Sequence, residues 1–220
     1  MPRPARATKD NPPLDDTRVQ HMLRSAAVAV ILFDPIAAEA LLDLPDVEVG
    51  RRFKICLARV MGTATVLNLD LASIREEDGR SNRGSEQRRS ARDSLVAEGK
   101  LLRAAIVCQA LGITEQRLAK DVESGRIFEV DIESRQYFPA FFLANELDRK
   151  QLRKVVRRLE GLTGWEKWEF FTTPRASLAK LTPLQVLLHG DVKQVLQTAD
   201  AFVACSKKLA KGKESDTRTS

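Results

Sequence analysis

Two helix boundaries near the carboxyl end place the strongest constraint on the fold. Thr182 is a good N-cap residue, Pro183 suits the first helical position, and Gln185 lies three residues after the cap. Gly190 can end that helix, and Asp191 can cap the next one. The apolar residues of the second helix recur at helical spacing: Val192, Val195, Leu196, Ala199, Phe202 and Val203. The pattern predicts two short helices that meet at residues 189–190, with an irregular run over residues 171–174 ahead of them.

Residues 165–203 resemble the C-terminal toxin-binding domain of the Xre/MbcA/ParS antitoxin family. The order and spacing of these features carry the resemblance: Trp168, residues 171–174, Leu178, residues 181–184, Gly190, Asp191 and Val195. Family members usually have a small polar residue and a glycine where this chain has Arg175 and Ala179-Lys180. The alternative is a plain two-helix terminal module held by a tryptophan.

The antitoxin resemblance implies that this segment binds a protein partner. In the family that partner is commonly a RES-domain toxin acting on nicotinamide dinucleotide. The residues implied in partner binding are Trp168, Phe171, Thr173, Pro174, Arg175, Leu178, Pro183 and Leu184.

Residues 93–143 predict a helix-turn-helix followed by a β-hairpin. Residues 101–111 read as an apolar helix, and residues 111–114 as a tight turn. Thr114 can cap a second helix that Gly125 ends. Residues 128–132 alternate between apolar and acidic, which predicts a strand, and residues 135–138 return as its partner after a turn. The outline is a winged helix-turn-helix.

This stretch looks like a DNA-binding domain of the excisionase/MerR type. The residues that carry the resemblance are 111–114, Leu118, Gly125, Arg126, Tyr137, Phe138, Pro139, Phe142 and Leu143. The resemblance implies DNA contact through Gln116, Arg117, Lys120, Arg126 and Arg135. Several acids lie on the same helix and wing: Glu115, Asp121, Glu123, Glu129 and Asp131. Because carboxylates repel phosphates, the alternative is a helix-turn-helix that binds proteins or dimerises.

Residues 145–160 predict an amphipathic helix with a strongly basic face. One face is apolar, with Leu152, Val155, Val156 and Leu159. The other face carries Arg149, Lys150, Arg153, Lys154, Arg157 and Arg158. Such a helix can bind nucleic acid, an acidic partner or a membrane surface, or can simply be solvated. We expect residues 144–205 to form one helical, partner-binding module.

The rest of the chain is less informative. We expect residues 1–13 to be a disordered basic arm and residues 206–220 a disordered tail. Residues 14–74 predict a mostly helical region with a break at Asp34-Pro35, although residues 51–71 also suit two strands. The five carboxylates of residues 34–48 are interpreted as a solvated face. Residues 75–92, rich in serine, glycine and arginine, predict a basic linker.

Composition narrows the function classes. Three isolated cysteines and two histidines give no zinc spacing, no cofactor is indicated, and free thiols favour the reducing cytoplasm. The most apolar run, residues 26–33, is too short to span a membrane. There is no phosphate-binding glycine loop and no nucleophile elbow, so we expect a protein without enzymatic activity. The net charge of +6 favours an anionic partner.

These observations predict a mainly α fold with a small β-hairpin wing. The leading functional hypothesis is an antitoxin-like DNA-binding regulator that is cytoplasmic, associated with the nucleoid, and homo-oligomeric. One alternative is a phage or plasmid accessory transcriptional regulator that uses the terminal module for self-association. The other is a scaffold or assembly protein with no role on DNA.

Overall fold

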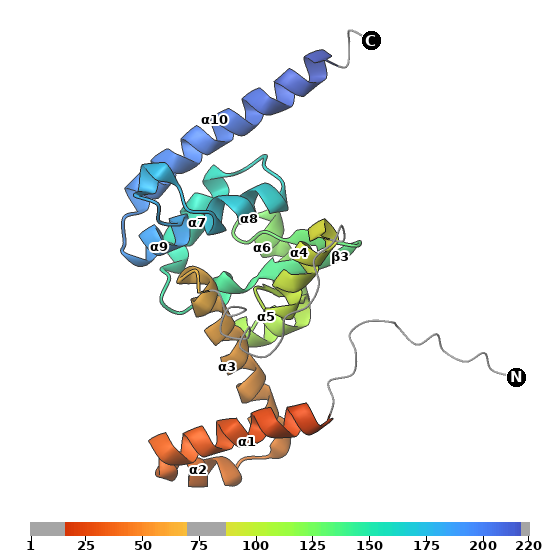
Figure 1. The fold of residues 1–220 in the computed structure, drawn as a ribbon, viewed down its shortest axis with the longest axis vertical. Helices are drawn as coiled ribbons and strands as arrows, with labels where there is room; N and C mark the ends of the chain where they lie inside the picture. The colour runs from red at the N-terminus through yellow and green to blue at the C-terminus, as the bar shows by residue number, and fades with distance from the viewer. Residues whose placement is uncertain (1–15, 70–86, 217–220) are drawn as a thin grey trace, which may run out of the picture. The chain divides into compact units, whose positions relative to one another are not determined.

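A computed structural model describes residues 16–69 and 87–216 of the 220-residue chain. The described residues form ten α-helices and one small, three-stranded antiparallel sheet (Figure 1). The predicted fold class, mainly α with a small β wing, is confirmed. The chain divides into two units, Met1–Arg52 and Phe53–Ser220, and the division falls inside a continuous helix.

The first unit contains three helical segments and no described side chain that is buried. These are α1 (Asp16–Phe33), α2 (Pro35–Leu42) and the start of α3 (Asp46–Val66). The predicted break at Asp34-Pro35 is confirmed. Pro35 occupies the first turn of α2, and the Asp34 carboxylate accepts a hydrogen bond from the Ala37 N–H at 2.9 Å. Of the two readings of residues 51–71, the helical one holds as far as Val66.

The second unit begins along α3, where Ala58, Ala64 and Val66 are buried. Gly62 lies so close to the backbone of Ala140 that a Cβ there would overlap its carbonyl oxygen. The next described element is α4 (Gln87–Ala97). Residues 87–92, the end of the expected linker, are therefore helical. Residues 70–86, which include most of that linker, and residues 1–13 lie outside the described residues.

The predicted helix-turn-helix and hairpin are present, but the first helix begins at residue 104 instead of 101 and the first strand of the hairpin at residue 130 instead of 128. The elements are α5 (Ala104–Leu111), α6 (Glu115–Glu123), β2 (Val130–Ile132) and β3 (Arg135–Pro139). Thr114 caps α6, and Gly112 and Gly125 take the left-handed conformation that ends each helix. Glu133 and Ser134 both have positive φ, as a tight two-residue hairpin turn requires.

One strand was not expected from the sequence. β1 (Leu101–Leu102) pairs antiparallel with β3, which makes β3 the central strand of the order β1-β3-β2. The sequence predicted helix from residue 101. This prediction was wrong for Leu101 and Leu102, which form a strand. Their strand partner, the Phe138–Pro139 end of β3, lies far along the chain, so the local apolar pattern does not indicate the pairing.

One aromatic core holds the second unit together. Phe141, in the 3-10 helix η2 (Ala140–Leu143), is fully buried. Its ring lies 6.0 Å from Phe128, 6.1 Å from Trp168 and 5.3 Å from Phe171, measured between centroids. The expected domain boundary after residue 143 therefore passes through a continuous core that joins the wing to the terminal helices.

The terminal helices follow in sequence. They are α7 (Arg149–Arg158), α8 (Gly164–Thr172), the 3-10 helix η3 (Ala176–Leu178), α9 (Pro183–Leu188) and α10 (Val192–Asp216). The predicted boundaries of α9 and the predicted start of α10 are confirmed, with a capping box at Thr182 and Gln185 and an Asp191 carboxylate that accepts from the Gln194 N–H.

Two segments near the carboxyl end differ from expectation. The run over residues 171–174 was predicted to be irregular, but its first half ends α8, which opens on an unpredicted capping box of Thr163 and Glu166. Residues 206–216, expected to be a disordered tail, continue α10 (Figure 1). The polar composition of this segment favours disorder over a newly formed helix. The segment is helical because it continues a helix that is already packed, so no new helical nucleus has to form.

Candidate nucleic-acid interface

The second helix of the helix-turn-helix presents a mixed face. Leu118 is 2% exposed and anchors α6 to the core, while Gln116, Arg117 and Lys120 are exposed as predicted. Glu115 and Glu123 are exposed on the same short helix. The formal charges of this face therefore come close to cancelling, so α6 alone offers weak attraction for phosphates.

Asp121 is the charged centre of this region. Its side chain is buried and lies 2.8 Å from Nη1 of Arg126 and 3.4 Å from Nε of Arg117. Its main-chain carbonyl accepts from the Arg126 and Ile127 N–H groups, at 2.8 Å and 3.2 Å. Arg126, predicted to contact DNA from the wing, is therefore engaged in holding the end of α6 against the following turn.

The wing is acidic and partly covered. The indole N–H of Trp165, in α8, donates to the Asp131 carbonyl at 3.0 Å, and Gly164 packs onto the Glu129 carbonyl. Burial, with a smaller contribution from the Asp131 charge, raises the pKa of Glu129. Arg135 is exposed at the start of β3. Because α8 covers β2 and carboxylates border the hairpin, this wing is poorly suited to lie along a phosphate backbone.

The basic residues concentrate on α7. Leu152, Val155 and Val156 are buried, and the Asp148 carboxylate caps the helix by accepting from the Lys150 and Gln151 N–H groups at 2.6 Å and 3.2 Å. The exposed face carries two rows at i, i+4 spacing: Arg149, Arg153 and Arg157, and Lys150, Lys154 and Arg158. Arg158 pairs with Asp200 of α10 at 2.7 Å. The other five form no ion pair with any described residue.

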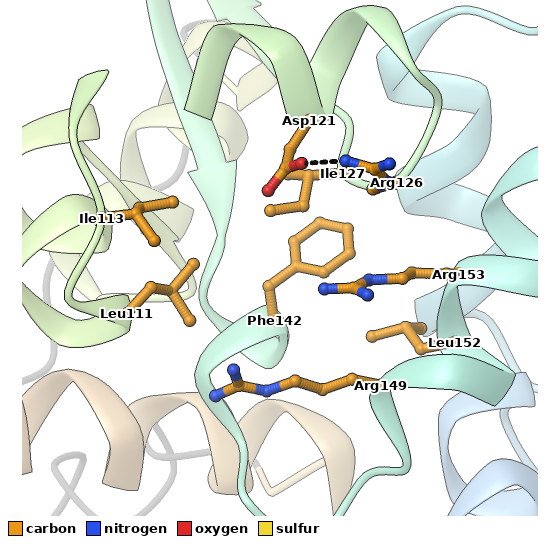
Figure 2. A pocket seen from close by; sticks show the side chains of 9 residues that line it. All are labelled: Leu111, Ile113, Asp121, Arg126, Ile127, Phe142, Arg149, Leu152 and Arg153. Atoms are coloured by element: carbon orange, nitrogen blue, oxygen red, sulfur yellow. Dashed lines mark hydrogen bonds and ion pairs between the residues drawn. The ribbon is translucent and has the colours of Figure 1, made fainter. Parts of the chain in front are cut away.

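A pocket lies between α7 and the helix-turn-helix (Figure 2). Its volume is about 80 Å³. Its apolar floor consists of Leu111, Ile113, Ile127, Phe142 and Leu152, and its polar rim of Asp121, Arg126, Arg149 and Arg153. Figure 2 shows Arg149 and Arg153 extending from α7 toward Phe142, while the carboxylate of Asp121 already has a partner in Arg126. Arg149 and Arg153 therefore lie near the carboxyl end of α6, as does Arg157, whose Cγ would lie 3.6 Å from a Cβ on Gly125.

Most of the predicted partner-binding residues lie in the core. Trp168 is 8% exposed, and the structure also buries Phe171, Leu178, Pro183 and Leu184. Trp168 stacks on Phe141, and Phe171 stacks on Phe128 at 6.0 Å. These side chains hold the terminal helices on the wing. They offer little area to another protein.

The loop between α8 and α9 holds the remaining predicted residues. Thr173 and Pro174 are exposed, but the guanidinium of Arg175 lies over the rings of Phe202 and Phe170, at 4.3 Å and 5.2 Å from their centroids. Burial lowers the pKa of Arg175, against an opposing effect of the Glu169 charge. Arg175, predicted to bind a partner, is therefore half-buried against two aromatic rings of its own chain.

Sequence reasoning missed two features of this region. Leu181 is 37% exposed beside the loop, and the pairing of Arg126 with Asp121 was not anticipated. The i, i+5 spacing of Asp121 and Arg126 could have suggested the pair, since a turn directly follows the helix. The exposure of Leu181 has no signal in the sequence, because the loop's contacts with α10 decide it.

No family model, curated protein or solved structure matches this chain. No helix among residues 16–69 and 87–216 is long and apolar enough to cross a membrane. The same residues contain no group of three or more His, Cys, Asp or Glu side chains that could hold a metal ion. The fold and the charges of the candidate site are therefore the basis for assigning a function.

Proposed function

We propose that this protein is a DNA-binding regulator in which α7 binds the phosphate backbone and α6 contacts the bases. The observation that carries the proposal is the basic face of α7, where five Lys and Arg residues form no ion pair with any described residue and where Arg149 and Arg153 line a pocket next to Asp121 of α6. Basic side chains release counterions on binding phosphates, which supplies most of the affinity of such proteins. Base contacts by a helix-turn-helix then supply the specificity.

The two helices divide the work differently from the sequence-based expectation. Gln116, Arg117 and Lys120 keep their proposed role, with Arg117 shared between DNA and Asp121. Arg126 instead shapes the end of α6. The acidic wing lies at the edge of the contact, so the backbone contacts fall to Arg149, Lys150, Arg153, Lys154 and Arg157.

The DNA proposal is tested by fluorescence anisotropy with labelled duplex DNA at several salt concentrations. Lys150→Glu/Lys154→Glu should weaken binding to every duplex, and should lower the log–log salt slope by about 0.9 for each lost phosphate contact. The matched control is Lys193→Glu/Lys207→Glu, which makes the same charge change at exposed positions of α10. Equal losses of DNA affinity in both variants would show that the effect comes from net charge alone. Unaltered binding by the α7 variant would refute the proposal.

Base contact by α6 needs a separate measurement. Gln116→Ala/Lys120→Ala should narrow the difference in affinity between the preferred duplex and a scrambled one, by about 1–3 kcal/mol for each lost base contact. The salt slope should change less than in the α7 variant. If the wild type binds all duplexes from its own promoter region with equal affinity, its DNA binding is non-specific and α6 makes no specific base contact.

A second candidate function, antitoxin-like capture of a protein, draws on the backbone of the α8–α9 loop. Ala179 and Lys180 both have positive φ, at 52° and 65°. This conformation favours glycine, the residue that the Xre/MbcA/ParS family usually has at this place. The support is thus a left-handed backbone in this chain at the place where the family usually has glycine. The partner would be a protein, with a RES-domain toxin as the expected class, meeting Thr173, Pro174 and Leu181.

Co-expression with a candidate toxin tests this second function. Pro174→Glu/Leu181→Glu should abolish co-purification, while the melting temperature falls little because both side chains are exposed. Retained capture by this variant would exclude the loop as the binding surface.

A further inference from the structure

The second half of α1 is apolar on both sides. Ala26, Ala29 and Val30 form a half-buried stripe at i, i+3, i+4 spacing. Val28, Ile31 and Leu32 repeat that spacing on the opposite side, with exposures of 50%, 57% and 75%. A helix that is apolar all round is normally buried. The outward stripe of α1 therefore lacks a covering surface among the described contacts of the first unit.

The exposed apolar surface continues beyond α1. Phe33 is 89% exposed, and Ile36 and Leu42 of α2 are 81% and 86% exposed. Val47, at the start of α3, is 84% exposed. α2 has no buried residue at all. Isolated helices as short as α2, with eight residues, are marginal in water, so these helices need tertiary partners to persist.

The exposed apolar area is close to the apolar part of a dimer interface. The large apolar side chains of the outward stripe and of α2 are Val28, Ile31, Leu32, Ile36, Leu41 and Leu42. With about 100 Å² for a fully exposed aliphatic side chain, their exposed fractions amount to roughly 390 Å². A standard interface buries about 800 Å² on each partner, of which roughly 450 Å² is apolar.

The charges beside this surface are self-complementary. α1 carries Arg18 and Arg24 and has no acid after Asp16. Residues 34–48 carry five carboxylates and no base, and of these Glu48 already pairs with Arg51 and Arg52 of its own chain. The described residues give Arg24 no ion pair. A two-fold interface places each patch against the same patch of the other copy, so the basic helix of one can meet the acidic segment of the other.

We propose that residues 16–49 are a dimerisation element whose occupant is a second copy of this chain. The outward stripe of α1 and the exposed residues of α2 from each copy form one helical bundle, with about 390 Å² of apolar surface buried per chain. This inference does not depend on DNA binding, since none of its residues belongs to the α6–α7 surface. It assigns the first unit a role in assembly and the second unit the role of ligand contact.

Sedimentation of the full chain over a concentration series is the test. The wild type should form a dimer, with twice the chain mass of 24.6 kDa. Ile31→Glu should raise the dimer dissociation constant at least about a hundredfold, because it buries an unpaired carboxylate. Val60→Glu is the matched control: Val60 is 58% exposed in the second unit against 57% for Ile31, and its substitution should change the constant less than about threefold.

Two further measurements guard against unfolding as the cause. Ile31→Ala keeps a strong helix former, so it should weaken the dimer about tenfold while far-ultraviolet circular dichroism stays unchanged. Hydrogen exchange should show protection of residues 19–49 that rises with wild-type concentration. A wild type that stays monomeric at about 100 μM would overturn the proposal. So would an Ile31→Glu variant that dimerises normally, or a Val60→Glu variant that dissociates equally. Protection that is independent of concentration would show that this face packs on its own chain.

Discussion

The two units use similar helices and bury them to opposite extents. Phe33, in α1, is 89% exposed, whereas Phe171, in α8, is fully buried and lies within about 6 Å of three other aromatic rings. Both residues lie in the last turn of their helices, so their position in the helix does not distinguish them. Helical spacing decides which residues share a face, but only a surface from elsewhere decides whether that face is covered. Burial in this protein is thus a property of long-range packing.

The largest expected effect comes from deleting the same side chain in each unit. Phe171→Ala should lower the free energy of unfolding of the second unit by about 3–5 kcal/mol, because it removes a ring from the aromatic core and leaves a cavity. Phe33→Ala should shift it by less than about 0.5 kcal/mol, as exposed positions usually do. Urea unfolding followed by the fluorescence of Trp165 and Trp168 measures both, since the two tryptophans lie in the second unit.

The concentration of the sample is the control for this pair. The measurement is made at low protein concentration, where any association of the first unit is absent. Similar losses from both substitutions would contradict the difference in packing between the units.

Helix α3 provides a second matched pair, because it has a glycine in each unit. A Cβ on Gly50 meets nothing within 4 Å, so Gly50→Ala should stabilise the helix by about 0.5–1 kcal/mol. A Cβ on Gly62 would overlap the carbonyl oxygen of Ala140, so Gly62→Ala should cost about 1–3 kcal/mol as the backbone moves apart. Thermal melts followed by circular dichroism and by tryptophan fluorescence give the two signs. Stabilisation by both substitutions would mean that α3 is not packed on η2.

The charged pairs give a smaller contrast. Asp121→Asn removes a buried charge that Arg126 and Arg117 share, and should cost about 1–3 kcal/mol. Glu48→Gln removes the pairs with Arg51 and Arg52 at the surface of α3, and the tryptophan-detected melt of the second unit should not change. If Asp121→Asn left that melt unaltered, the Asp121 pair would not fasten α6 to the following turn.

Features with local signals were predictable from the sequence. The helix caps at Asp34, Thr114, Thr182 and Asp191 depend on a side chain and an N–H two or three residues away, so the sequence contains the whole interaction. The left-handed glycines and the tight turn at residues 133–134 belong to the same class. The basic face of α7 followed from helical spacing, whereas the exposed positions of α6 were those that the excisionase/MerR resemblance implied.

The features that could not be predicted have partners far along the chain. β1 exists because Leu101 and Leu102 meet β3, and Trp168 and Phe171 are buried because the rings of Phe141 and Phe128 lie against them. The stacking of Arg175 on Phe202 removed a charged residue from the expected binding surface in the same way. Burial at each of these sites is decided by residues that spacing rules do not connect.

The smallest expected effect concerns the protonation of two glutamates with opposite perturbations. Hydrogen bonds from Arg51 and Arg52 lower the pKa of Glu48, so the stability it contributes is present above its unfolded pKa and is lost as the pH falls. Burial raises the pKa of Glu129, so its contribution is present below the unfolded pKa and is lost as the pH rises through the folded pKa. At neutral pH, the Glu129 carboxylate therefore opposes folding of the second unit.

Glu129→Gln should consequently raise the melting temperature of the second unit at neutral pH, by an amount that corresponds to under about 1 kcal/mol. The Gln136 amide, which donates to Glu129 Oε1 at 2.9 Å, can donate equally to an amide oxygen at that place. The difference between variant and wild type should shrink at about pH 4, which is below the ordinary pKa of glutamate, because the wild-type carboxyl is then protonated as well. Tryptophan-detected melts at both pH values measure it, with Glu48→Gln as the control that leaves this signal unchanged. The opposite result would be a variant whose melting temperature is below that of the wild type at neutral pH and equal to it at about pH 4. It would show that the charged carboxylate stabilises the wing.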